Sequence, residues 1–179
     1  MRASSLWLCV ALSTSVAPLT FTAASHAATA APPSVQSIME AMNKANAAVV
    51  GIRVTAVEGS RSAENLGMKR TGSGVVIGAD GLVLTIGYLM LEAENIEIVT
   101  QDNRTVPATA VAYDIATGFG LVRPLLPLRG VAPVTLGSVR DLKPGEPLMA
   151  ATGATGGANG EDGGVSMTQL VNTRAFSGT

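Results

Sequence analysis

The two residue types that carry most nucleophilic and metal chemistry occur once each in this chain, as Cys9 and His26. Thiolate nucleophiles, imidazole bases and most zinc or transition-metal sites require cysteine or histidine. Both residues lie within the first 27 positions. If that segment is removed, the rest of the chain cannot build a classical Ser, Cys or His nucleophile system. It also cannot form a disulfide or a zinc site with these ligands.

The first 27 residues have the three parts of a secretory signal peptide. Arg2 supplies a minimal positive charge, and residues 6–12 are an apolar run too short to span a bilayer. Ser25-His26-Ala27 has the small-x-small pattern of a cleavage site. We therefore expect cleavage after Ala27, a periplasmic or secreted mature protein, and no membrane span after signal removal. A short N-terminal anchor is the alternative, but Pro18 interrupts any longer apolar run.

Charge and composition exclude further functions. Charged residues make up 14% of the chain and aromatic residues 3%, with 12 Lys+Arg against 13 Asp+Glu. A chain without a basic excess or an aromatic run has little with which to bind nucleic acid. The glycine-rich segment 153–164 offers only Glu161 and Asp162 as carboxylates, whereas a calcium loop needs several oxygen ligands at alternate positions. We expect no metal and no cofactor.

A short amphipathic helix is predicted at about 35–45. Val35, Ile38, Met39 and Met42 recur on one face, and Ser37 and Glu40 have the spacing of a capping box. Methionines in such a stripe usually fill a core. We therefore expect this face to be buried.

The rest of the chain follows the two-residue period of β-strands. The strand candidates are residues 49–57, 74–77, 82–85, 96–100, 105–112, 119–122, 134–136, 146–152 and 165–176. Turn signals lie at 78–81 and 102–103, and the polar segment 58–71 is predicted to be a loop. Pro124, Pro127 and Pro133 mark an extended connector between two lobes. This spacing of short strands predicts an all-β protein built from antiparallel barrels or a sandwich.

The order of several fragments resembles the HtrA/Deg type of trypsin-like serine proteases. The fragments are Ala48-Val49-Val50-Gly51-Ile52, residues 72–77, residues 80–85, Asp102-Asn103-Arg104, Leu136-Gly137-Ser138, residues 143–153 and residues 165–168. The resemblance runs from about residue 35 to the end and implies the fold of those exported enzymes, a trypsin-like double β-barrel. It divides the chain into a signal peptide at 1–27, a leader and short helix at 28–47, a complete first β-barrel at 48–123 and a partial second β-barrel at 124–179.

The catalytic positions of that family are not matched. The family's T-N-x-H-V motif corresponds to Thr85-Ile86-Gly87-Tyr88-Leu89, which places Tyr88 at the catalytic histidine. Its D-x-x-x-D motif begins at Asp114 and places Gly118 at the catalytic aspartate. The residues up to Thr179 stop short of the G-N-S-G-G segment that would carry the nucleophile, and Ser177-Gly178 is at most an echo of it.

A triad needs an imidazole base, an orienting carboxylate, a nucleophile and backbone donors for the oxyanion. The phenol of tyrosine is almost entirely protonated at neutral pH, so Tyr88 is a poor base. We therefore predict that the Tyr88 ring packs as an aromatic plug over the position of the catalytic site. We assign no catalytic, cofactor-binding or metal-binding residue.

The sequence leaves three functional interpretations open. The first is an exported trypsin-fold homologue without peptidase activity, with a binding or regulatory role and a protein or peptide partner. The second is a fragment of an active serine endopeptidase of the HtrA type. The third is an unrelated β-rich structural or adhesion module. Under the first interpretation, the strand from about Val165 lacks the partners that close a second barrel, which predicts self-association through an unpaired strand edge.

Overall fold

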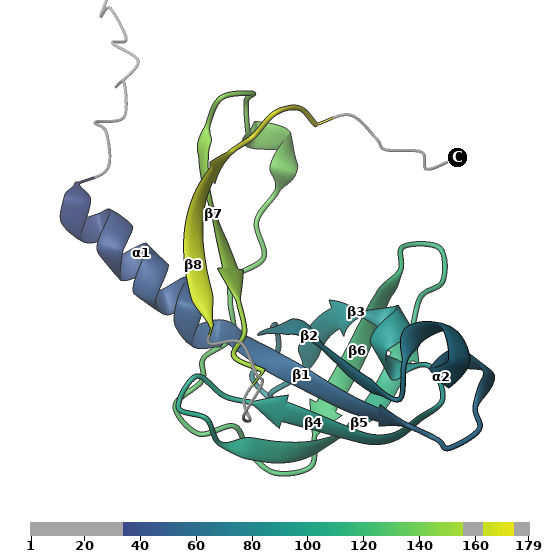
Figure 1. Ribbon diagram of the computed structural model, residues 1–179. Helices are drawn as coiled ribbons and strands as arrows, with labels where there is room; N and C mark the ends of the chain where they lie inside the picture. The colour runs from purple at the N-terminus through teal and green to yellow at the C-terminus, as the bar shows by residue number, and fades with distance from the viewer. Residues whose placement is uncertain (1–33, 156–162, 174–179) are drawn as a thin grey trace, which may run out of the picture. The chain divides into compact units, whose positions relative to one another are not determined.

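The computed structural model describes residues 34–155 and 163–173 (Figure 1). The predicted signal peptide, Glu161-Asp162 and Ser177-Gly178 lie outside these ranges. The elements, in chain order, are the helix α1 (Val35–Ala48), β1 (Val49–Ala56), the helix α2 (Arg61–Leu66), β2 (Lys69–Val76), β3 (Val83–Ile86), the 3₁₀ turn η1 (Gly87–Met90), β4 (Ala93–Val99), β5 (Thr105–Tyr113), β6 (Phe119–Pro124), the 3₁₀ turn η2 (Val139–Asp141), β7 (Pro147–Thr152) and β8 (Gly164–Gln169).

The first six strands form a closed antiparallel barrel in the order β1-β2-β3-β6-β5-β4. Its closure is made by β1, which pairs with β2 on one edge and with β4 on the other, so that Ile52 lies opposite Gly72 and also opposite Ile98. The inward side chains of these strands and of η1 fill the interior with Val50, Ile52, Val54, Val76, Val83, Leu89, Met90, Ile96, Ile98 and Val122. The prediction of an all-β fold with a complete first barrel is confirmed.

Two turns of the barrel depend on backbone conformations that their residues favour. Gly81 has φ +83° in the turn between β2 and β3, a left-handed conformation that costs glycine little. Asn103, with φ +58°, occupies the same region in the turn between β4 and β5, where asparagine is among the few tolerated residues. Both turns lie where the sequence predicted them.

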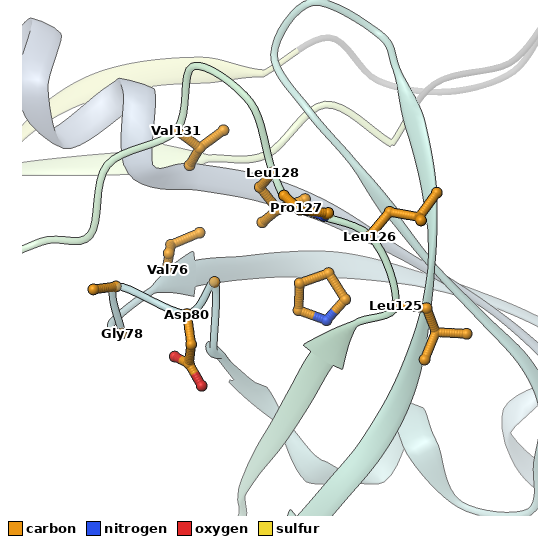
Figure 2. Close-up of a pocket in the computed structure, with 11 residues that line it drawn as sticks. Val76, Gly78, Asp80, Leu125, Leu126, Pro127, Leu128 and Val131 are labelled. Atoms are coloured by element: carbon orange, nitrogen blue, oxygen red, sulfur yellow. The ribbon is translucent and has the colours of Figure 1, made fainter.

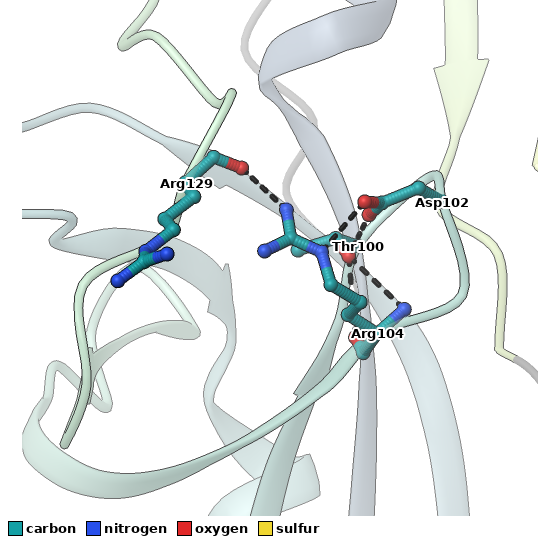
Figure 3. A network of polar contacts seen from close by, with 4 residues as sticks. All are labelled: Thr100, Asp102, Arg104 and Arg129. Carbon is teal, nitrogen blue, oxygen red and sulfur yellow. Dashed lines mark hydrogen bonds and ion pairs between the residues drawn. The ribbon is translucent and has the colours of Figure 1, made fainter.

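Polar contacts fasten the turn between β4 and β5 to the connector after β6 (Figure 3). Asp102 accepts a hydrogen bond from the Thr100 hydroxyl and another, of 2.6 Å, from Arg104 Nε. The second arm of the same guanidinium donates to the Arg129 carbonyl oxygen at 2.6 Å. These hydrogen bonds, first from Thr100 and then from Arg104, lower the pKa of the Asp102 carboxyl.

A close backbone approach joins the barrel to the segment just after β7. The Gly153 N–H donates to Ser73 Oγ at 3.0 Å. A Cβ placed on Gly51 would lie 1.6 Å from the Ala154 carbonyl oxygen, and one on Gly153 would lie 2.1 Å from the Val50 carbonyl oxygen. Ala154 itself is buried. Glycine is therefore required on both sides of this junction.

After the barrel, β7 and β8 pair as a two-stranded antiparallel sheet, in which every residue of β8 is exposed.

Several predictions for the N-terminal helix are wrong. The cap is Ser34 and not Ser37, because the Ser34 hydroxyl accepts the Ser37 N–H at 3.1 Å. The helix also continues to Ala48, where the run of β-branched residues begins. Its apolar face is not core, since Val35, Ile38 and Met39 are exposed. Met42 lines a shallow apolar groove with Met149 and Met167 of the β7–β8 sheet.

Two further predictions fail in the connecting segments. The predicted loop 58–71 contains α2 and the start of β2. A contact distant in sequence holds this short helix, because the Ser62 N–H donates to Glu92 Oε2 at 2.7 Å. The predicted strand 134–136 does not form. Val134 makes a single backbone hydrogen bond of 2.9 Å to the Val76 carbonyl oxygen and no ladder of such bonds.

No helix within residues 34–155 and 163–173 has the length and hydropathy needed to cross a membrane.

We predict that Gly51→Ala lowers the free energy of unfolding by about 1–3 kcal/mol, as overpacking of a tight interior does. The new methyl group would collide with the Ala154 carbonyl, so the junction must open. Urea unfolding measures the difference.

The matched control is Gly137→Ala, because no atom lies within 4 Å of a Cβ at that position. This variant is expected to stay within about 0.5 kcal/mol of the natural chain. Equal urea midpoints for both variants would contradict the close approach at the junction.

Candidate functional site

The two positions that the resemblance assigns to histidine and aspartate meet at the adjoining ends of β3 and β6. These strands pair antiparallel with Ile86 opposite Phe119. Tyr88 comes after β3 within η1, and Gly118 directly precedes β6. The Gly87 N–H donates to the Gly118 carbonyl oxygen at 2.8 Å, which holds the two segments together. The fold therefore brings both positions to one place, although neither carries a residue of the triad.

Tyr88 does not form the packed plug that the sequence predicted. Its side chain is 41% exposed, whereas Leu89 and Met90 of the same turn are buried in the barrel core. The 3₁₀ turn thus directs its aliphatic residues inward and leaves the phenol accessible to solvent.

Gly118 lies in a tight turn. As a glycine, it supplies no carboxylate at the position that the resemblance assigns to the catalytic aspartate. Its φ of +77° is left-handed, so an aspartate there would be strained. The retained acid, Asp114, accepts hydrogen bonds from the Thr117 hydroxyl at 2.6 Å and from the Ala116 N–H at 3.0 Å. These two bonds lower the pKa of the Asp114 carboxyl. The carboxylate therefore stabilises its own turn.

A buried guanidinium fixes the position of η1. Arg70 is 4% exposed and donates to the carbonyl oxygens of Leu91 at 2.7 Å and Gly67 at 3.1 Å. It also donates to Ser62 Oγ at 2.7 Å and to the carbonyl of Tyr88 at 3.3 Å. The carbonyl groups at the end of a helical turn have no partners within the turn, so a cation placed there satisfies them. Arg70 thereby positions the segment that carries Tyr88.

The aromatic side chains gather around this place. Within residues 34–155 and 163–173, the aromatic residues are Tyr88, Tyr113 and Phe119. They are 41%, 38% and 54% exposed, so none of them belongs to the core. Tyr113 lies against Gly87, where an added Cβ would come within 2.0 Å of the ring. Motif order in the sequence pointed to Tyr88 and not to the other two, because strand periodicity does not show which aromatic residues remain exposed at the end of a barrel.

An apolar pocket of about 280 Å³ adjoins the two positions. It is lined by Val49, Ser73, Gly74, Val75, Leu84, Thr85, Ile86, Phe119 and Ala151. The two hydroxyl groups in this wall are engaged, because Thr85 Oγ1 donates to the Ser73 carbonyl at 2.8 Å and Ser73 Oγ accepts the Gly153 N–H. The wall contains no charged side chain. Such a surface suits an apolar group and offers no acid or base.

A second cavity, of about 420 Å³, lies at the other end of β3 (Figure 2). It is formed by the turn 78–81 and by the connector that contains Leu125, Leu126 and Leu128. Its one titratable side chain, Asp80, forms a 3.4 Å ion pair with Arg123. This cavity therefore presents a single carboxylate, which is ion-paired and partly exposed, among mostly apolar residues.

The polar groups around Tyr88 do not form an acid–base pair for peptide hydrolysis. The described part of the chain contains no histidine or cysteine, and it has no group of three or more His, Cys, Asp or Glu side chains that could hold a metal ion. Asp114 is held in its turn by Thr117, and Tyr88 is a phenol. The described residues around Tyr88 therefore contain no imidazole–carboxylate pair of the kind that a triad uses.

Comparison with known proteins identifies relatives of this barrel. A family model for the trypsin-like peptidase domain matches residues 72–175, more than half of the chain. The serine protease PepD of Mycobacterium tuberculosis is 31% identical over an alignment of 88 residues, and the match covers 44% of this chain and 19% of PepD. The chain therefore spans about a fifth of the length of this relative.

Solved structures with the same fold include the HtrA-type protease AlgW with a tripeptide, and a variant of it, also with a tripeptide. Each has a TM-score of 0.59 and 22% sequence identity, and each alignment covers 75% of this chain and 39% of the other. These findings confirm the resemblance to HtrA-type trypsin-like proteases and the trypsin-like fold.

Proposed function

Because this chain belongs to the trypsin-like peptidase domain family, we propose that it is an exported homologue that binds peptide segments and does not hydrolyse them. The observation that carries the proposal is the 2.8 Å hydrogen bond between the Gly87 N–H and the Gly118 carbonyl. It brings the histidine and aspartate positions together as the family's chemistry requires. Tyr88 and Gly118 then stand at those positions, so the base and its orienting acid are both replaced.

The energetic consequence of this replacement is large. Loss of a complete serine-protease triad lowers kcat by roughly six orders of magnitude. The remaining contributions of substrate binding and of any oxyanion donors do not restore proton transfer. The replacement at positions 88 and 118 is independent of any residues beyond Thr179.

Peptide binding is supported by the surface that remains. The structural neighbour AlgW is described with a tripeptide, so a protein of this fold holds a short peptide. In this chain, the exposed aromatic residues Tyr88 and Phe119 and the apolar pocket beside them lie where the catalytic groups would be. Exposed aromatic side chains that are not needed by a core are typical of binding surfaces.

Export is proposed from the order of Arg2, the apolar run 6–12 and Ser25-His26-Ala27. The intact mass of the protein recovered from the exported fraction is expected to correspond to a chain that begins at Ala28. An exported protein that still contained Met1 to Ala27 would contradict this part of the proposal.

We expect the purified chain to cleave neither casein nor peptide esters and to remain unlabelled by fluorophosphonate probes. The chain, its Tyr88→Phe variant and a heat-denatured sample should give the same background, because no residue at position 88 is acting as a base. An active trypsin-like protease in parallel verifies the assay.

Turnover that is lost in Tyr88→Phe would refute the absence of catalysis. It would show that the phenol takes part in the reaction, and it would favour the interpretation that the chain is a fragment of an active endopeptidase.

A further inference from the structure

We propose that Met42, Met149 and Met167 form an oxidation site, where peroxide converts the thioethers to sulfoxides and loosens the contact between α1 and the β7–β8 sheet. The three residues line the apolar groove of about 360 Å³ between the helix and the sheet. The methionine stripe of α1 thereby belongs to a contact that an oxidant can open. Nothing in this mechanism requires peptide binding near Tyr88.

The three thioethers converge on one face of the β7–β8 sheet. Met149 lies directly opposite Met167 in the antiparallel ladder, so their Cβ atoms are about 4.5–5.5 Å apart on the same face. Met42 reaches that face from α1, which packs against β7. Methionine is flexible and polarizable and fills irregular gaps between elements. Three of the eight residues that line the groove are methionines, so their oxidation changes much of this contact.

The exposure of these methionines makes them accessible to a small oxidant in water. Met167 is 62% exposed, and Met42 and Met149 are half-buried. Met90, by contrast, is 8% exposed within the barrel core. Residues 34–155 and 163–173 contain no cysteine, histidine or tryptophan, so the methionine thioethers are the most readily oxidised side chains in this part of the chain.

The reaction is a two-electron transfer of one oxygen atom. The sulfur lone pair attacks one oxygen of hydrogen peroxide, the O–O bond breaks and hydroxide leaves. The hydroxide takes the proton from the new S–OH group, which gives the sulfoxide and one molecule of water. Sulfur is oxidised by two electrons and the peroxide is reduced by two, so no further reactant is needed.

The groove cannot hold the polar product. A sulfoxide oxygen accepts hydrogen bonds, but no charged side chain lines the groove. The one hydroxyl group in its wall, Ser37 Oγ, already donates to the Ser34 carbonyl oxygen at 2.8 Å. Burial of a polar group without a partner is unfavourable. The oxidised side chains therefore turn toward water, and α1 loses its packing against the sheet.

Stepwise addition of hydrogen peroxide to the full chain tests this site. Peptide mapping by mass spectrometry gives the sulfoxide fraction at each methionine, and we expect Met167 to be oxidised about tenfold or more faster than Met90. Hydrogen exchange is then measured on samples in which Met90 is still reduced. The amides of α1, β7 and β8 should exchange about tenfold faster than before oxidation, whereas those of β1 in the barrel should keep their rates.

Two variants locate the effect at the groove. Combined Met42→Leu, Met149→Leu and Met167→Leu substitutions conserve side-chain volume and remove the oxidisable sulfur, so peroxide should leave the exchange rates unchanged. The matched control combines Met39→Leu with Met68→Leu. These residues are 57% and 39% exposed and do not line the groove, so this variant should still loosen on oxidation.

Reversal gives a measurement that needs no substitution. Methionine sulfoxide reductases with dithiothreitol return the sulfoxides to thioethers and should restore slow exchange in α1 and the β7–β8 sheet. Dithiothreitol alone, which can reverse mild oxidation of Cys9 but leaves sulfoxides in place, should not restore it.

Three results would overturn the oxidation site. They are equal oxidation rates at Met167 and Met90, unchanged exchange after the groove methionines are oxidised, and equal loosening in the triple leucine variant. If that variant does not fold, the reductase measurement decides, and exchange that stays fast after reduction of the sulfoxides overturns the site.

Discussion

The closure of the barrel by β1 is the constraint on which the rest of the structure depends. Because β1 pairs with both β2 and β4, the six strands leave no free edge in the barrel, and each inward residue meets others across the interior. The same closure fixes the order of the sheet and places β3 beside β6. Residues 88 and 118 are 30 positions apart in sequence, and this neighbouring pair of strand ends brings them together.

The contacts that position residues 88 and 118 belong to the fold of the barrel itself. Arg70 still satisfies the carbonyl groups around η1, and Asp114 still closes the turn before β6. Such contacts stabilise the fold itself, whatever side chain stands at position 88. At the surface, the Tyr88 phenol and the left-handed Gly118 stand at the positions that the resemblance assigns to histidine and aspartate. The consequence is that Tyr88 is held in place by its backbone while its side chain remains accessible to solvent.

Much of this barrel could be predicted because its determinants are local. Alternation in residues 96–100 and the turn at Asp102-Asn103 specify a hairpin without any tertiary information. The failures concern segments held by distant contacts. The short helix α2 depends on Glu92, and the segment at Val134 forms one backbone bond and no ladder. The apolar stripe of α1 has helical periodicity, but periodicity alone does not show that an element is available to cover it.

The candidate site was predictable to a similar degree. Motif order identified Tyr88 and Gly118, since the residues around them match in sequence. Phe119 and Tyr113 could not be recognised, because their importance lies in exposure and in the packing of Tyr113 against Gly87. The packed plug predicted for Tyr88 failed for the same reason: a 3₁₀ turn gives its residues different environments, and the sequence does not show which side the phenol faces.

The central claim is that the region around Tyr88 and Gly118 binds a peptide segment and leaves the peptide intact. Amide chemical shifts of the full chain, recorded while an Ala-Ala-Leu-Ala-Ala peptide is added, test it most directly when the mass of the peptide is checked afterwards. The account predicts shifts centred on Ile86, Phe119 and Ala151, with the peptide mass unchanged. A cleaved peptide, or shifts confined to α1 and the β7–β8 sheet, would contradict it.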